Sequence, residues 1–178
     1  CSDVCSSDLG LTFISVLIII VSLISVTSIQ TLKATTYRVE HSQQVKEKLW
    51  QIVSGANELT SSDRGYLISN NEEFLEAWDQ SKINMRQGYA ELNSLVRDNP
   101  EQEGEILILY NLVEERIKFS ELLVETFKTA GPDAAYQLLS TLKGKRISDE
   151  IKLLAAHIKD EEINHYFNEK EIEYQNAA

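Results

Sequence analysis

The residues best suited to chemistry lie near the C-terminus, where two histidines are spaced with acidic residues. His157, Glu161 and His165 follow one another at intervals of four, which places them on one face of a helix. Glu162 also forms a Glu-x-x-His pair with His165. A di-iron bundle needs that motif twice, with a glutamate from each of two further helices. Because no second copy occurs, we predict no metal site, with His165 on a bundle face and the acids in solvent.

A second group that could bind a ligand is the run Arg64-Gly65-Tyr66. The guanidinium of Arg64 could bind a carboxylate ligand or join two helices through a bidentate ion pair. In the alternative interpretation, which we favour, Gly65 permits close helix packing, Tyr66 fills the core, and Arg64 pairs with a local acid. These three residues are the candidate ligand-binding or signalling residues of the chain.

Two other features are interpreted as structural. Trp50 and Trp78 are predicted to anchor the core or an interface rather than to hold a ligand. A basic cluster near a predicted turn is interpreted as solvating that turn, although Gly144 would allow an anion site there. The cluster consists of Lys143, Lys145 and Arg146.

Catalytic motifs are missing from the sequence. A phosphorylatable histidine of a kinase is followed by an acidic residue and then a proline, and the residues after His157 lack that order. None of the seven glycines belongs to a Gly-x-x-x-x-Gly-Lys-Ser/Thr phosphate loop. We therefore predict no catalytic residues, no cofactor and no enzymatic activity for this chain.

The charge of the chain limits its partners. It has 28 acidic and 17 basic residues among 178, and a formal net charge of −11. Phosphate backbones are bound through lysine and arginine, so this balance argues against nucleic acid. Only seven glycines and two prolines occur, so few residues would interrupt long helices.

The first residues read as foreign to the protein. The segment Asp3–Leu9 resembles a translated sequencing adapter, and we predict that residues 1–9 are an artefact that does not belong to the fold. Both cysteines, Cys1 and Cys5, lie within them. The rival interpretation is a Cys-x-x-x-Cys metal or disulfide pair, but two ligands alone do not make a zinc site.

An apolar run follows, which begins at Leu11 and ends at Ile29 and contains no charged residue. A helix needs about 20 apolar residues to cross the hydrocarbon core of a bilayer. A cleaved signal peptide is the alternative, but no Ala-x-Ala-like site follows Ile29. We therefore predict a transmembrane helix over residues 10–29 that contacts the lipid bilayer.

The rest of the chain, residues 30–176, has helical periodicity throughout and is predicted to be a helical-bundle domain. Breaks are predicted at residues 69–71, 98–100, 131–133 and 143–145. They delimit four long amphipathic helices and one short segment at residues 134–142. Short connections favour antiparallel neighbours, so we predict an all-α, up-down four-helix bundle preceded by one transmembrane helix. An extended coiled coil is the alternative.

Three short motifs recur in the order and spacing of a known family. They consist of Arg64, Gly65, Tyr66, Leu67, Phe74 and Leu75, then Asp98, Asn99, Pro100 and Glu103, then residues 131–135 with Gly144 and Lys145. Together these motifs resemble the CHASE3 family of extracellular sensor domains, found in bacterial membrane-bound sensor histidine kinases. The resemblance extends from about Thr36 to Asn168. The family often has an acidic residue and Thr-Gly where this chain has Thr60, Ser61 and Ser62, so a role tied to that acid is in doubt.

The resemblance implies an extracytoplasmic sensor domain of a plasma (inner) membrane receptor. It implies the N-terminal part of a two-component sensor histidine kinase, whose downstream signalling domains would follow this fragment. Receptors of this kind are expected to be homodimers that respond to a small-molecule or protein stimulus by helix displacement. Two alternatives stay open, a ligand-binding module of a chemotaxis receptor or cyclase, and a structural membrane-tethered spacer.

Overall fold

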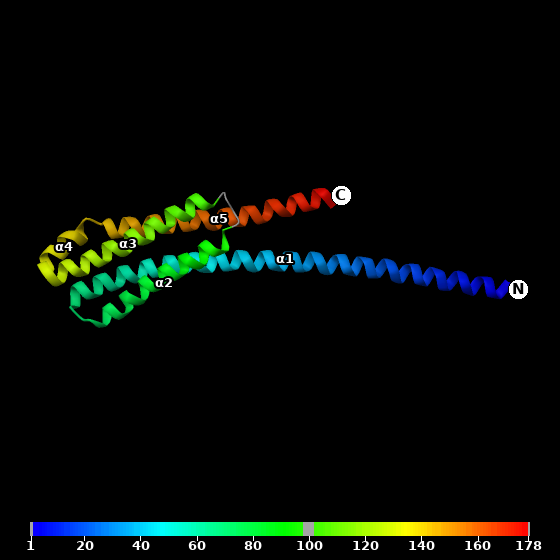
Figure 1. The fold of residues 1–178 in the computed structure, drawn as a ribbon, viewed down its shortest axis with the longest axis horizontal. Helices are drawn as coiled ribbons and strands as arrows, with labels where there is room; N and C mark the ends of the chain where they lie inside the picture. The colour runs from blue at the N-terminus through cyan, green and yellow to red at the C-terminus, as the bar shows by residue number, and fades with distance from the viewer. Residues whose placement is uncertain (1, 98–101, 178) are drawn as a thin grey trace. The chain divides into compact units, whose positions relative to one another are not determined.

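The computed structural model describes residues 2–97 and 102–177, and every regular element in these ranges is an α-helix. The all-α prediction is therefore confirmed for the described part of the chain. The elements are α1 (Ser2–Ser69), α2 (Glu73–Leu95), α3 (Glu103–Ala130), α4 (Pro132–Ser140) and α5 (Lys143–Ala177) (Figure 1). The chain divides into two compact units, Cys1–His41 and Ser42–Ala178.

The first unit consists of the N-terminal part of α1 and carries the apolar run. The window Phe13–Gln30 has a mean hydropathy of 2.4, and none of it is buried in the structure. Length and composition make this window suitable for crossing a membrane. It overlaps the transmembrane helix predicted over residues 10–29.

The second unit is a bundle of four long helices, with the short α4 inserted between α3 and α5 (Figure 1). The C-terminal part of α1 packs against α2, as shown by the hydrogen bond from Gln51 Nε2 to the Asn84 carbonyl oxygen at 3.1 Å. Helix α3 contacts α2, α4 and α5. These neighbours confirm the predicted up-down four-helix bundle. Its core contains the buried side chains Val45, Leu49, Ile52, Ala56, Leu59, Met85, Leu92, Leu109, Val113, Ile117, Ile147, Ile151 and Ile158.

The turn between α1 and α2 forms where it was predicted, at residues 69–71. Asn70 has a φ of 51°, a left-handed conformation that asparagine tolerates better than most residues. Its amide donates to the Tyr66 carbonyl oxygen at 2.8 Å and closes α1. The side-chain oxygen of Asn71 accepts from the Glu73 amide at 3.0 Å, which satisfies one of the free amides at the start of α2.

The two breaks around α4 differ in how well the sequence predicted them. Gly131, with a φ of 90°, ends α3, and Pro132 begins α4 as expected. The next break lies at Thr141 and Leu142, before the predicted residues 143–145, which instead form the first turn of α5. Leu142 itself takes the left-handed conformation, with a φ of 58°. The break predicted at residues 98–100 lies outside the described residues.

Two glycines allow α1 and α2 to approach closely. A Cβ on Gly55 would lie 2.5 Å from Met85 Cγ and 3.3 Å from the Ser81 carbonyl oxygen. A Cβ on Gly88 would lie 3.2 Å from Ile52 Cγ1. The small residues thus let the backbone of each helix lie against side chains of the other, and they set the position of α2 on the bundle.

Candidate functional site

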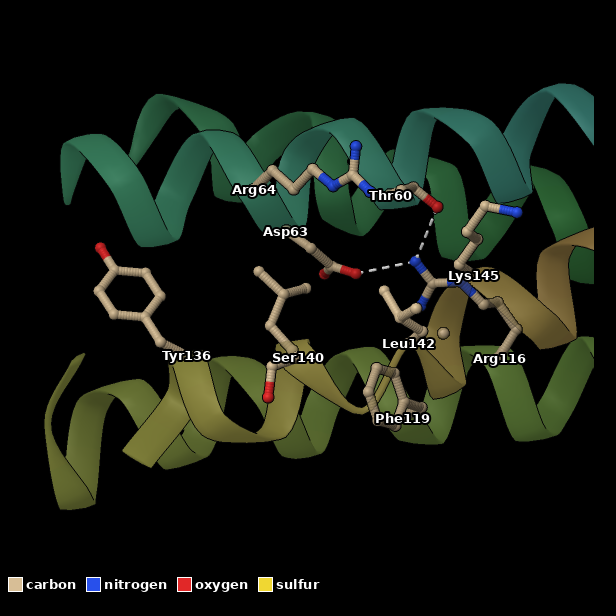
Figure 2. Close-up of a pocket in the computed structure, with 11 residues that line it drawn as sticks. Thr60, Asp63, Arg64, Arg116, Phe119, Tyr136, Ser140, Leu142 and Lys145 are labelled. Atoms are coloured by element: carbon tan, nitrogen blue, oxygen red, sulfur yellow. Dashed lines mark hydrogen bonds and ion pairs between the residues drawn. The ribbon is translucent and has the colours of Figure 1, made fainter. Parts of the chain in front are cut away.

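A buried ion pair lies inside the bundle, between Arg116 of α3 and Asp63 of α1 (Figure 2). The two side chains are only 1% and 3% exposed, and Arg116 Nη2 lies 2.8 Å from Asp63 Oδ2. Removing two charges from water is costly, so such a pair persists only where good geometry and further hydrogen bonds offset the desolvation. The surroundings of both charges therefore decide what the site can do.

Two hydroxyl groups, one on α1 and one on α5, accept further hydrogen bonds from the guanidinium of Arg116. Arg116 Nε donates to the Ser148 hydroxyl of α5 at 3.0 Å, and Nη2 donates to the Thr60 hydroxyl of α1 at 3.0 Å. Thr60 in turn donates to the Ala56 carbonyl oxygen. Arg116 thus joins α3 to both the first and the last helix of the bundle.

The carboxylate of Asp63 is held from the opposite direction. Its Oδ1 accepts a hydrogen bond from the Ser120 hydroxyl of α3. Ser120 accepts from the indole Nε1 of Trp78, on α2, at 2.6 Å. Asp63 therefore has partners on both oxygens, and the network that begins at Arg116 reaches all four long helices. Trp78 packs against the core as predicted, whereas Trp50 is 70% exposed.

One edge of the guanidinium has no partner among the described residues. The Nη1 atom of Arg116 is buried and makes no hydrogen bond. The Arg116 side chain also lines a pocket of about 360 Å³, whose lining residues are drawn in Figure 2. Helices α1, α3, α4 and α5 all contribute to its walls. The lining residues are Thr60, Asp63, Arg64, Arg116, Phe119, Tyr136, Leu139, Ser140, Leu142, Gly144 and Lys145.

The three predicted site residues are consecutive in α1 but face different surroundings. Arg64 is exposed and lines the pocket, without an ion pair to any described residue. Gly65 faces away toward α2, where a Cβ would lie 2.3 Å from the ring of Phe74. Tyr66 is buried and meets the ring of Phe127 edge to face, with 5.2 Å between the ring centroids. A role of the three in ligand binding or signalling stays a prediction.

Sequence reasoning missed Asp63 and Arg116, although the spacing held a signal for both. On α3 the buried positions include Leu109, Val113, Arg116, Ser120 and Leu123, which follow one another at alternating steps of four and three. On α1 the same steps run through Ile52, Ala56, Leu59, Asp63 and Tyr66. These steps mark the inward face of a bundle helix. A charged residue at an inward position on each of two helices indicates a buried pair.

Two members of the basic cluster that was predicted to solvate a turn, Lys143 and Lys145, lie in different surroundings: one on the bundle surface and the other at the pocket. Lys143 pairs with Glu115 at 2.9 Å on the bundle surface. Lys145 pairs with Asp149 and lines the pocket. Gly144 is buried, and a Cβ there would lie 2.8 Å from the ring of Phe119. The start of α5 therefore lies directly against the pocket.

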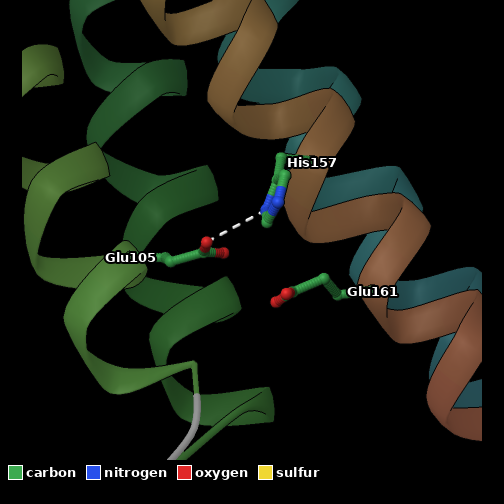
Figure 3. Close-up of side chains that lie close together, drawn as sticks. All are labelled: Glu105, His157 and Glu161. Atoms are coloured by element: carbon green, nitrogen blue, oxygen red, sulfur yellow. Dashed lines mark ion pairs between the residues drawn. The ribbon is translucent and has the colours of Figure 1, made fainter.

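The predicted histidine face is completed by a residue from another helix. His157 Nδ1 lies 2.9 Å from Glu105 Oε1 of α3, and Glu161 lies within 4.8 Å of both groups (Figure 3). His157 is 58% exposed, and its pairing with Glu105 accounts for the arrangement as a surface ion pair. The side chain of His165 lies outside the described residues, and the absence of a metal site stays a prediction.

Comparison with known proteins gives one family and one structural neighbour. The family model of the CHASE3 domain matches residues 35–165. The crystal structure of the Rhodopseudomonas palustris histidine kinase HK9 sensor domain is similar, with a TM-score of 0.64 at 20% identity. The similarity covers 71% of this chain and 98% of that chain, and it establishes the shared fold. No curated protein matches the chain in sequence.

Proposed function

This chain belongs to the CHASE3 family of sensor domains, and from that premise we propose that it is the extracytoplasmic sensor of a transmembrane signal-transduction receptor. The receptor we propose is a two-component sensor histidine kinase of the plasma (inner) membrane, of which this chain is the N-terminal part. The observation that carries the proposal is the order of two features. A membrane-length apolar window, Phe13–Gln30, directly precedes the family match over residues 35–165.

The proposed signal is a displacement of the first and last helices of the bundle. Helix α1 contains the apolar window, and α5 is the last element of the chain. Within the bundle these helices are coupled through Arg116, which bonds Thr60 and Asp63 on α1 and Ser148 on α5. A stimulus that alters these bonds would favour a different arrangement of the two helices and so shift a population of receptor states. A homodimer would transmit that shift across the membrane as a change between subunits.

Disulfide crosslinking in membranes tests this proposal. The chain is fused in frame, through a second membrane span, to a histidine kinase output module, with Cys1 and Cys5 replaced by serine. Leu32→Cys is then introduced at an exposed position just after the apolar window. We expect crosslinks between subunits and a several-fold change in autophosphorylation on oxidation. The same variant alkylated before oxidation is the control.

Two results would contradict the sensor proposal. One is crosslinking at Leu32→Cys that leaves kinase output unchanged. The other concerns the rival role of a membrane-tethered spacer, which requires only a rod of suitable length. If an unrelated four-helix bundle in place of residues 42–164 preserves the response to every stimulus of the receptor, the spacer role holds instead.

A further inference from the structure

We propose that the pocket beside Arg116 binds a small organic anion, specifically a carboxylate with an apolar body. This site is formed by residues of α1, α3, α4 and α5 and by Leu142 between the last two (Figure 2). Three independent features of the pocket lead to this ligand class. They are an unsatisfied buried donor, an excess of positive charge, and an apolar wall.

The unsatisfied donor is the Nη1 group of Arg116. A guanidinium carries five N–H groups, of which Nη1 supplies two. The donors on Nε and Nη2 are bonded to Ser148, Thr60 and Asp63, so the two on Nη1 remain. A buried donor without a partner is costly, and more so on a charged group. Nη1 has less than 1 Å² of accessible surface, so a ligand oxygen reaches it from the pocket only when the wall moves aside. That oxygen would then accept from Nη1 and remove the cost.

The charges around the pocket select an anion. Arg64, Arg116 and Lys145 line it, against the single carboxylate of Asp63, which is already paired with Arg116. Lys145 is also paired with Asp149, which does not line the pocket, whereas Arg64 has no ion pair to a described residue. A carboxylate placed at Nη1 would gain from both rim cations in a partly desolvated site. A cationic ligand would be repelled.

The remaining wall selects a ligand with an apolar part. Phe119, Leu139 and Leu142 contribute hydrophobic side chains. Tyr136 donates its hydroxyl to the Leu67 carbonyl oxygen at 2.9 Å, so that polar atom is already engaged. Pockets for organic ligands combine such apolar walls with a few fixed polar groups. A volume of about 360 Å³ accommodates a ring or a short chain beside the carboxylate.

The site deepens the proposed function, and its signalling consequence rests on that function. A ligand there would touch α1 and α5 at once, at the residue that couples them. Binding itself does not depend on signalling, so an experiment can contradict the carboxylate site without contradicting the proposed receptor function, and the reverse. Loss of carboxylate binding would leave the crosslinking result at Leu32→Cys unaffected.

Isothermal titration calorimetry on the full chain in lipid nanodiscs tests the site, with empty nanodiscs as the blank. The probe is cyclohexanecarboxylate, and its neutral isostere cyclohexanecarboxamide and inorganic sulfate are the comparison ligands. We expect saturable carboxylate binding with a Kd of about 1 mM or tighter. The amide, which lacks the charge, and sulfate, which lacks the apolar body, should each bind at least about tenfold more weakly.

Variants with exposed side chains locate the binding without disturbing the core. Arg64→Gln and Lys145→Gln should each weaken carboxylate binding about threefold to tenfold, because each removes a rim cation. Lys143→Gln is the matched control, since Lys143 belongs to the same basic cluster but does not line the pocket. Circular dichroism and thermal melting verify that each variant is folded.

Any of three results would overturn the inference. The first is the absence of saturable heat with cyclohexanecarboxylate up to about 20 mM, which leaves less binding free energy than a built site provides. The second is equal affinity for the amide or for sulfate. The third is carboxylate binding that persists unchanged in both Arg64→Gln and Lys145→Gln, which would place it elsewhere on the chain.

Discussion

At the scale of single residues, the buried Arg116–Asp63 pair is expected to have the largest effect on the stability of the bundle. Both side chains are almost completely buried, and each depends on the other for neutrality. Asp63→Asn keeps the shape of the side chain but leaves the charge of Arg116 uncompensated. We expect this variant to lose about 3–5 kcal/mol of unfolding free energy. Urea denaturation followed by circular dichroism measures it.

Two further variants serve as controls for Asp63→Asn. Arg64→Gln, one position along α1 and exposed, should change the unfolding free energy by less than about 0.5 kcal/mol. Asp63→Leu combined with Arg116→Met removes both charges and should recover most of the loss, because no buried charge is left. Equal destabilisation by Asp63→Asn and Arg64→Gln would contradict the importance of the buried pair.

Leu142 provides a second prediction at this scale, because it is a branched residue in the left-handed region, with a φ of 58°. This conformation costs a non-glycine residue about 1–2 kcal/mol. Since the side chain is 55% exposed, Leu142→Gly loses little packing. It should stabilise the chain by about 1 kcal/mol in urea denaturation.

The matched control for Leu142 is Leu107, which is similarly exposed, at 59%, but lies within α3. Leu107→Gly should destabilise the chain by roughly 0.5–1 kcal/mol, since glycine is a poor helix former. Opposite signs for the two substitutions would establish that backbone strain, rather than side-chain loss, decides the effect at Leu142. The same sign for both would refute it.

The candidate site could be predicted only in part from single residues. Arg64 was singled out by its motif, and it lies at the pocket. Asp63, its immediate neighbour, was not predicted, because the acid typical of the family is expected within Thr60 to Ser62 and is absent there. The partner of Asp63 lies 53 residues away, and only the packed bundle brings Arg116 to it. Tertiary contacts of this kind leave no trace in local spacing beyond a polar residue on an apolar stripe.

At the scale of the elements, the close approach of α1 and α2 depends on glycine. Gly55→Ala would place a methyl group 2.5 Å from Met85 Cγ and 3.3 Å from a backbone carbonyl of α2. The flexible methionine can move, but the backbone resists, so we expect a loss of about 1–3 kcal/mol. Thermal and urea unfolding measure the loss.

Gly104→Ala is the control for this packing effect. Gly104 lies near the start of α3, where an added methyl group would meet no neighbouring element within 4 Å. Alanine there should stabilise the helix by about 0.5–1 kcal/mol through its better helix propensity. Stabilisation by both substitutions would show that α1 and α2 are farther apart than described.

A surface ion pair between α2 and α3 makes part of the stability dependent on pH. Arg86 Nε and Nη2 donate to the two carboxylate oxygens of Glu114 at 2.8 and 2.9 Å. The hydrogen bonds from Arg86 hold the pKa of the Glu114 carboxyl below its ordinary value of 4.5. Because the folded pKa is lowered, this stabilisation is complete above 4.5 and is lost as the pH falls through the lowered pKa.

The comparison of wild type with Arg86→Gln isolates this pair from other acids. At about pH 6 the variant should be less stable than wild type, and the difference should shrink as the pH is lowered toward about 2, because protonation of Glu114 progressively removes the pair. Urea denaturation at both pH values measures the two differences. A stability difference that does not change with pH would contradict the pairing of Arg86 with Glu114.

At the scale of the whole molecule, the fold was largely predictable because each helix has a regular apolar face and few glycines or prolines interrupt it. The turn at Asn70 and the stop at Gly131 carry residues that favour a positive φ, so local chemistry placed them correctly. The break before α5 was misplaced because glycine at position 144 is typical of a helix break. Its small size instead serves contact with Phe119, a tertiary reason that the local sequence does not reveal.

We expect the buried network to determine how the bundle opens. Arg116 and Ser120 of α3 are bonded to α1 and α5, and Trp78 adds α2, so detaching any one long helix exposes or unpairs a group on another. Backbone amides beside the network should therefore exchange with deuterium at one common rate, set by a single opening of all four helices. In Asp63→Leu combined with Arg116→Met, α2 and α5 should exchange independently of each other. In a sensor domain with such a network, the ends of the helices can move separately, whereas the four helices separate from one another at the network only all together.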